Sequence, residues 1–148
     1  MTPVVAPLVL AVDRILLHLS CDRLCLTTLL TGLPVMLVTT TGARTGCLRE
    51  HPLTALRESD RFALVASNFG RSRYPGWYYN LRAHPDAQIR LAGRQQPVRA
   101  RPASSEERAR FWAIAVHHYP GYALYERRAA PRPVPVFVLE PSEDPVAR

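Results

Sequence analysis

Residues 34–53 read PVMLVTTTGARTGCLREHPL, and this stretch decides the fold. Its first half is rich in β-branched side chains, which pack well in a pleated sheet and resist helix formation. Gly42 and Gly46 then bracket a tight turn, because glycine adopts the positive φ angles that such turns need. Residues 47–57 follow as a second strand, with Pro52 at a bulge or an edge where no amide hydrogen is required. The stretch therefore predicts a β-hairpin.

The tip of this hairpin carries Ala43, Arg44 and Thr45. Backbone amides, one guanidinium and one hydroxyl can converge there on an anion. A solvated turn explains the same residues, since turns are polar for conformational reasons. The spacing alone leaves both interpretations open.

The chain has 148 residues, of which 47% are hydrophobic and 21% charged. This composition indicates one globular domain and excludes disordered and fibrous proteins. All 19 basic residues are arginine, and the formal net charge is +7. Because arginine binds phosphate and carboxylate groups bidentately, a nucleotide, a polycarboxylate, nucleic acid or an acidic membrane surface are all permitted partners.

Three cysteines, Cys21, Cys25 and Cys47, form no CxxC pair, which argues against a disulfide framework, a zinc site or a dithiol redox centre. A reducing compartment follows. The five histidines are scattered and are interpreted as surface or capping residues, so no metal site is predicted. The sequence also lacks a nucleophile elbow, a Rossmann fingerprint and a Walker loop.

Residues 6–31 are the most apolar part of the chain, with Leu8, Ile15 and Leu19 on one helical face and Asp13 on the opposite face. The uncharged run is shorter than the roughly 20 residues that span a bilayer, and no basic signal-peptide start precedes it. We expect an amphipathic helical segment over 1–33 that packs on the body, with contact to a membrane surface as the alternative.

The rest of the chain alternates turn signals with short periodic segments. Strands are predicted at 61–68, 86–91, 95–101 and 136–139, helices at 77–83 and 104–118, a further turn at 122–128 and a frayed tail at 141–148. Six strands without a βαβ rhythm predict a mostly antiparallel sheet rolled into a small barrel, with helices on its flank.

Tyr119, Tyr122 and Tyr125 follow one another at i, i+3 and i+6 beside a Pro-Gly break. On one side of a short helix they can wall a pocket and offer phenolic hydroxyls, which at neutral pH are better proton donors than bases. A packed aromatic stripe explains the same spacing. The pattern therefore supports both a substrate pocket and a core cluster.

Several motifs occur in a fixed order: LVTTTGARTG at 37–46, then Arg49, Pro52-Leu53, VASN at 65–68 and PGWYYNLRAHP at 75–85. Together they resemble the deazaflavin-dependent nitroreductase family over residues 30–140, and several motifs that agree are more specific than any one. The resemblance implies a mainly β fold with flanking helices, a six-stranded antiparallel split β-barrel of the FMN-binding type covering 34–140. It also implies a cytoplasmic enzyme that passes hydride from reduced coenzyme F420 to a quinone, a nitro compound or an activated alkene.

The resemblance assigns cofactor-binding residues position by position. The cofactor phosphate and acidic tail would be held by Arg44, Thr45 and Arg49. The deazaflavin ring would lie along Pro52, Leu53 and Thr54, with the wall completed by Ser67, Asn68, Trp77 and Asn80. Basic residues are frequent in the family at the places of Ala43 and Asn68, which implies a weaker grip on the anionic end here.

The resemblance also places the catalytic residues around the acceptor. These are Tyr119, Tyr122, Tyr125 and Ser67, with Tyr122 expected to orient the substrate or help protonate it. The partner is then a small-molecule acceptor, and the protein is a monomer or a homodimer.

Two alternatives compete with this interpretation. The same barrel could use FMN or merely store a cofactor, or the chain could be a basic module without enzymatic activity that binds nucleic acid or an anionic membrane. Against the second alternative, the arginines are spread through the whole chain and no nucleic-acid-binding motif is present.

Overall fold

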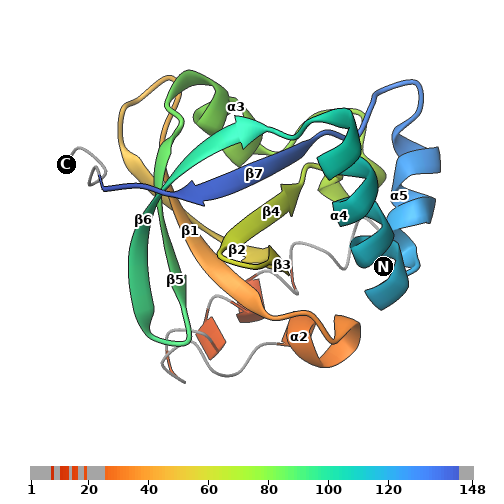
Figure 1. Ribbon diagram of the computed structural model, residues 1–148, viewed down its shortest axis with the longest axis horizontal. Helices are drawn as coiled ribbons and strands as arrows, with labels where there is room; N and C mark the ends of the chain where they lie inside the picture. The colour runs from red at the N-terminus through yellow and green to blue at the C-terminus, as the bar shows by residue number, and fades with distance from the viewer. Residues whose placement is uncertain (1–7, 9–10, 14, 17–18, 20–25, 144–148) are drawn as a thin grey trace.

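The computed structural model describes residues 8, 11–13, 15–16, 19 and 26–143. Seven antiparallel strands form one sheet that curls into a barrel, with helices beside it (Figure 1). The strands are β1 (Val35–Thr41), β2 (Leu48–Thr54), β3 (Leu56–Glu58), β4 (Arg61–Val65), β5 (Asp86–Leu91), β6 (Arg94–Pro102) and β7 (Val136–Pro141). The helices are α2 (Leu26–Thr31), α3 (Gly76–Ala83), α4 (Ser105–His118) and α5 (Gly121–Ala129), with a 3-10 turn η1 (Asn68–Gly70). The predicted split-barrel class is confirmed.

The two ends of the sheet are made by two strands that follow each other directly in the chain. The strand order is β2-β1-β5-β6-β7-β4-β3, so β2 and β3 are outermost although only Ala55 separates them in the chain. At the bend, the amide of Ala55 donates to the carbonyl of Pro34 at 2.8 Å. The prediction of one strand over 47–57 is therefore wrong, and the predicted six strands become seven.

Strand β4 ends earlier than predicted. The apolar pattern indicated extended chain through Asn68, but the strand ends at Val65. Asn68 and Phe69 have φ angles of +46° and +57°, a left-handed conformation that cannot continue a strand. The chain therefore leaves the sheet within the VASN motif, directly after Val65.

The C-terminal elements extend further than predicted. The short helix expected for the tyrosines is α5, which covers the further turn predicted at 122–128, and β7 continues to Pro141 because it pairs with β6 as far as Val98. Residues 144–148 of the expected frayed tail lie outside the described residues.

Two apolar clusters stabilise the barrel on opposite faces of the sheet. Along β7, Phe137 and Leu139 join the interior cluster, whereas Val136 and Val138 pack with Phe111 of α4 on the outer face. Alternate side chains of a strand point to opposite faces, so burial of both faces requires a continuous apolar run. This explains why residues 136–139 form a continuous apolar run.

The N-terminal segment does not pack as its pattern predicted. Where described, it is helical, but Leu8, Ile15 and Leu19 are 66%, 59% and 78% exposed, whereas Asp13 is only 1% exposed. The expected orientation is wrong because the Asp13 carboxylate bonds the amide and hydroxyl of Thr27 on α2. Among the described residues, no helix combines the length and apolarity needed to span a membrane. Cys21 and Cys25 lie outside the described residues.

Glu107 anchors α4 to the sheet. Arg101 of β6 donates to its two carboxylate oxygens at 2.7 and 2.8 Å, and Arg61 of β4 donates at 3.1 Å. Glu107 also accepts the amide of Ser104 in the predicted capping box, which is present. The hydrogen bonds from Arg101, and then that from Ser104, lower the pKa of Glu107 to about 2.

We expect Glu107→Gln to lower the melting temperature at neutral pH and to flatten its dependence on pH. Because the folded-state pKa of about 2 lies below the usual 4.5, ionised Glu107 stabilises the fold above pH 4.5, and this stabilisation is lost as the pH falls from 4.5 towards 2. Thermal unfolding followed by circular dichroism across this range measures the effect. Glu106→Gln, which alters an exposed carboxylate in the same helical turn, is the control. A Glu107→Gln profile parallel to wild type would contradict the assignment.

Candidate active site

The β1–β2 turn forms one side of a cleft of about 740 Å³, which we call the arginine cleft. Its described lining contains three arginines and no carboxylate: the residues are Gly42, Ala43, Arg44, Thr45, Arg49, His51, Gly76, Tyr79, Asn80, Arg82 and Ala83. Arg44 and Arg49 are exposed, and neither guanidinium has a hydrogen-bond or ion-pair partner within the part of the chain that the structure describes. Two unpaired guanidinium groups on one cleft favour binding of a phosphate or carboxylate.

The turn that presents these arginines is held by short-range hydrogen bonds. The amide of Gly42 donates to the carbonyl of Cys47, and the amide of Gly46 donates to Gly42, both at 2.8 Å. A Cβ atom at Gly42 would lie 2.7 Å from the hydroxyl of Thr45 and 3.1 Å from the carbonyl oxygen of Cys47, so a side chain there would crowd the turn. Asn80 of α3 accepts the amide of Ala43 at 3.0 Å. The predicted cofactor residue Asn80 therefore fixes the position of the turn.

A second cavity, of about 610 Å³, opens where the barrel splits between β2 and β4. We call it the tyrosine cavity. Its described lining is Asp13, Thr27, Thr31, Val35, His51, Pro52, Leu53, Thr54, Leu64, Val65, Ser67, Asn68, Phe69, Arg71, Tyr74, Pro75, Gly76, Trp77, Tyr119, Tyr122 and Tyr125. Before the bend at Ala55 the chain pairs with β1 as β2, and after it the chain pairs with β4 as β3, so β2 and β4 both contribute walls to the cavity.

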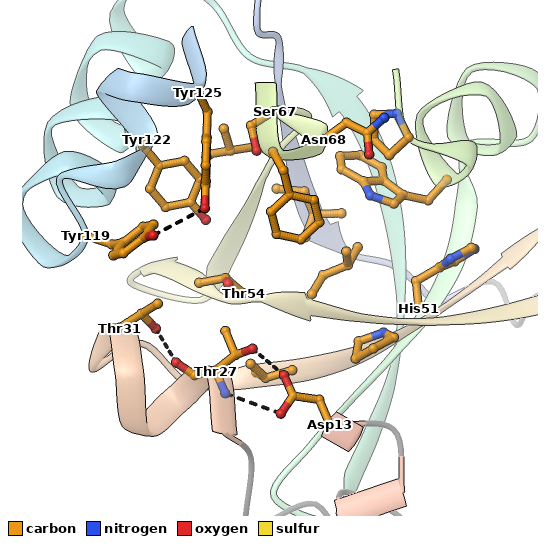
Figure 2. A pocket seen from close by; sticks show the side chains of 18 of the residues that line it. Asp13, Thr27, Thr31, His51, Thr54, Ser67, Asn68, Tyr119, Tyr122 and Tyr125 are labelled. Atoms are coloured by element: carbon orange, nitrogen blue, oxygen red, sulfur yellow. Dashed lines mark hydrogen bonds between the residues drawn. The ribbon is translucent and has the colours of Figure 1, made fainter. Parts of the chain in front are cut away.

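The three predicted tyrosines converge at one end of this cavity (Figure 2). Tyr119 follows α4, whereas Tyr122 and Tyr125 belong to α5. The hydroxyls of Tyr119 and Tyr125 are 3.2 Å apart, and the ring centroids of all three pairs are 6.0–6.1 Å apart. A Cβ atom at Gly121 would lie 2.2 Å from the Tyr119 ring, so this ring position needs the glycine of the Pro-Gly break.

Burial keeps two of the three phenols, those of Tyr122 and Tyr125, protonated. It raises the pKa of Tyr122, with a side-chain hydrogen bond to Thr54 opposing the shift. Burial and the hydrogen bond with Tyr119 raise the pKa of Tyr125. Both residues are therefore neutral phenols at physiological pH, and each can donate a hydrogen bond or a proton.

The wall beside the tyrosines is the loop from Ala66 to Arg71, which was predicted partly as a strand and in which the Phe69 ring contacts that of Tyr125, with centroids 5.8 Å apart. Arg132 holds it by donating to the carbonyl groups of Ala66, Ser67 and Arg71, at 2.8–3.2 Å. The amide side chain of Asn68 donates to the carbonyl of Arg73 at 2.8 Å. Asn68 thus lines the cavity while its side chain shapes the loop.

Two parts of the lining were not predicted. Asp13, Thr27 and Thr31 bring the N-terminal segment to the cavity, with the Thr31 hydroxyl donating to the carbonyl of Thr27 at 2.7 Å (Figure 2). Thr27 and Thr31 stand at i and i+4 in an apolar segment, and this spacing is the sequence signal that could have placed both hydroxyls on one helical face. His51, expected to be a surface or capping residue, is half-buried and lines both cavities.

All of the predicted site residues lie in one of two adjoining cavities. Arg44, Thr45, Arg49 and Asn80 line the arginine cleft, and Pro52, Leu53, Thr54, Ser67, Asn68, Trp77, Tyr119, Tyr122 and Tyr125 line the tyrosine cavity. The cavities share His51 and Gly76, so they are contiguous. One cavity has apolar and aromatic walls and the other has arginines, a combination suited to a ligand with a flat ring and an anionic end.

Comparison with known proteins decides the family. Residues 22–141 match the family described as F420H2-dependent quinone reductase. The chain belongs to this family. An F420H2-dependent quinone reductase of Mycobacterium tuberculosis strain H37Rv is 39% identical over 109 residues, which are 72% of this chain and 72% of that protein.

Two solved structures resemble this F420H2-dependent quinone reductase family member. One is an F420H2-dependent reductase, with 39% identity, a TM-score of 0.66, and coverage of 72% of this chain and 94% of that one. The other is described as a domain-swapped dimer, with 39% identity, a TM-score of 0.67, and coverage of 72% and 80%. The family thus confirms an F420H2-dependent reductase with coenzyme F420 as its cofactor, in place of FMN.

The residues present fit this coenzyme. Its phosphate and acidic tail are anionic, and the arginine cleft offers the unpaired guanidinium groups of Arg44 and Arg49. Its ring is flat, and the adjoining tyrosine cavity has apolar and aromatic walls such as Leu53 and Trp77. Among the described residues, no group of three or more His, Cys, Asp or Glu side chains is placed to hold a metal ion.

Proposed function

We propose that this reductase passes hydride to a quinone bound in the tyrosine cavity. The observation that carries the proposal is the junction of a cleft that carries Arg44 and Arg49, neither paired within the described part of the chain, and a cavity with three converging phenols. The names of the relatives, which are quinone reductases, support the same acceptor class. A quinone has two carbonyl oxygens, and neutral phenols are suited to donate to them.

Binding in this proposal is divided between the cavities. Arg44, Thr45 and Arg49 bind the phosphate and acidic tail through charge-assisted hydrogen bonds. Pro52 and Leu53 lie along the ring. Bound F420H2 supplies the hydride, and the protein's contribution is to hold donor and acceptor in reach, which replaces an unfavourable encounter in solution.

The phenols act on the acceptor. Tyr122 is the residue that we assign to orient the quinone and to donate a proton to its developing oxyanion, because burial keeps its hydroxyl protonated. Tyr119 and Tyr125 form a hydroxyl pair beside it at 3.2 Å. Ser67, on the wall that Arg132 holds, completes the proposed catalytic set.

The test begins with binding and then compares acceptors. The purified protein is titrated with coenzyme F420 and, separately, with FMN, while cofactor fluorescence is followed. Oxidation of F420H2 is then measured with menadione, a nitroaromatic compound and cyclohexenone under anaerobic conditions. We expect micromolar binding of F420 alone and the highest kcat/KM with menadione. Tighter binding of FMN would contradict the cofactor, and a higher kcat/KM with either other acceptor would contradict the quinone.

In the same assay we expect Tyr122→Phe to reduce kcat with menadione about a hundredfold, the lower end of what a lost general acid costs. The affinity for F420 is expected to stay unchanged, because in this proposal the phenol contacts the acceptor and not the cofactor. Tyr78→Phe is the control, since Tyr78 is buried in the interior cluster and lines neither cavity. An unchanged kcat would remove the role assigned to Tyr122.

A further inference from the structure

Three consecutive residues of the loop after β4 have left-handed backbone conformations. The φ angles are +46° at Asn68, +57° at Phe69 and +78° at Gly70. Glycine adopts this conformation without steric cost and asparagine tolerates it, whereas a bulky side chain such as that of phenylalanine rarely adopts it. Such a backbone outlier persists only where the surrounding structure enforces it, and outliers of this kind cluster at functional sites. Phe69 is therefore the residue of this loop whose presence needs an explanation.

Hydrogen bonds on both sides of Phe69 hold its backbone in this conformation. Arg132 donates to the carbonyl of Ser67 at 2.8 Å on one side and to the carbonyl of Arg71 at 2.9 Å on the other. Within the loop, the amide of Gly70 donates to the same Ser67 carbonyl at 2.9 Å. The surrounding structure thus fixes the direction in which the Phe69 side chain leaves the loop.

The Phe69 ring is half-buried but belongs to none of the apolar clusters that the described residues form. Within the described part of the chain, the one aromatic ring that it contacts is Tyr125, with centroids 5.8 Å apart and an interplanar angle of 80°. In such an edge-to-face pair, at least one face of each ring remains uncovered by the other. Because Phe69 also lines the tyrosine cavity, a flat ligand in that cavity can pack on the uncovered face.

A structural role alone does not account for this residue. Glycine would adopt the left-handed conformation without strain, and the apolar clusters on both faces of the sheet form without the Phe69 ring. The contact with Tyr125 places the ring at the end of the cavity where the three tyrosines converge. In the proposed function, this is the end that binds the acceptor.

We propose that Phe69 is an acceptor-binding residue whose ring packs on the flat face of the quinone and favours acceptors with an extended ring system. The inference rests on the proposed function, which places the quinone among the tyrosines. Because the loop already holds the ring beside Tyr125, little conformational freedom is lost when the quinone binds. Phe69 then orients the plane of the quinone ring, while Tyr122 donates to its oxygen.

The experiment compares two quinones that differ in ring size. Menadione has two fused rings, and duroquinone has a single ring. KM and kcat for both are measured with F420H2 under anaerobic conditions, for wild type, Phe69→Leu and Phe69→Tyr. Fluorescence titration gives the dissociation constant of F420 for each protein. The control is Phe62→Leu, the same substitution in β4 at a residue that lines neither cavity.

We expect Phe69→Leu to raise KM for menadione about fivefold, the scale of one lost aromatic contact, with kcat changed less than about twofold. KM for duroquinone should rise only about twofold, because in an offset stack the second fused ring adds contact with the phenyl group. Phe69→Tyr retains the ring and should keep both wild-type KM values. The affinity for F420 should stay unchanged in both variants, and Phe62→Leu should leave the ratio of the two KM values unchanged.

The backbone strain has a separate measurable consequence. Phe69→Gly and Phe69→Ala both remove the ring, but only glycine adopts the left-handed conformation without steric cost. We therefore expect Phe69→Gly to melt about 3 °C above Phe69→Ala, as followed by circular dichroism. Equal melting temperatures would contradict the strain from which the inference starts. If Phe69→Leu does not fold, Phe69→Gly takes its place in the kinetic comparison.

Three kinetic or binding results would also overturn the inference. An unchanged KM for menadione in the folded Phe69→Leu protein would remove the contact. A fivefold loss of F420 affinity in that variant would place the ring against the cofactor, and an equal rise of KM for both quinones would contradict packing on the fused rings. If wild type oxidised F420H2 with neither quinone, the proposed function would fail and this inference with it, whereas the other results leave the proposed function standing.

Discussion

Arg132→Leu is expected to lower the free energy of unfolding by about 3 kcal/mol, because several charge-assisted hydrogen bonds are lost together and their carbonyl partners lose a donor. The guanidinium bonds the carbonyls of Ala66, Ser67 and Arg71, and it stacks over the ring of Tyr74 at 4.6 Å. These partners form one wall of the tyrosine cavity. Binding of coenzyme F420 is therefore expected to weaken along with stability.

Urea unfolding followed by circular dichroism measures the loss of stability, and fluorescence titration measures binding. Arg132→Lys is expected to recover little of the lost stability. The planar guanidinium donates to several carbonyls in different directions, whereas a lysine ammonium is a compact group that cannot reach all of them. The matched control is Arg127→Leu, which removes an exposed arginine from the nearby helix α5. Equal stability of the Arg132→Leu and Arg127→Leu proteins would refute the role of Arg132.

Gly70→Ala is expected to cost about 3 kcal/mol and to move the same wall by steric conflict. Gly70 has a φ angle of +78°, and a Cβ atom there would lie 2.6 Å from Cβ of Arg128 and 2.9 Å from the carbonyl oxygen of Tyr125. Neither atom is the end of a flexible side chain, so the loop and α5 must separate. The left-handed conformation adds about 1 kcal/mol and the overpacking about 1–3 kcal/mol.

Gly93→Ala separates the two contributions. Gly93 has nearly the same φ angle, +77°, but a Cβ atom there meets nothing within 4 Å. This variant should lose only the conformational part, about 1 kcal/mol. Urea unfolding of both variants provides the comparison, and acceptor kinetics should deteriorate for Gly70→Ala alone. Equal stability of the Gly70→Ala and Gly93→Ala proteins would show that the loop accommodates the added methyl group at no energetic cost.

The features that could be predicted from the sequence are those that depend on neighbouring residues. The β1–β2 hairpin follows from β-branched residues and two glycines, and the start of α4 follows from Ser104 and Glu107. The tyrosine spacing correctly marked three residues that line one cavity. In each case the information lies within about one turn of the chain.

The features that could not be predicted depend on residues far apart in the sequence. Arg132 bonds carbonyls more than 60 positions away, and backbone carbonyls carry no sequence signal. Asp13 appeared to belong to a polar face because nothing local indicates that Thr27 folds back on it. His51 was assigned to the surface because its partner Thr40 stands on another strand. Tertiary pairing decided all three.

The bend at Ala55 has a consequence for how this fold tolerates changes in length. Because one residue joins β2 to β3, an insertion or deletion there would shift one strand by a single position relative to the other. Side chains alternate strictly along a strand, so such a shift would exchange the inward and outward faces of either β2 or β3. Evolution of this segment should therefore proceed by substitution, with its length held constant, while the surface turns elsewhere remain free to lengthen.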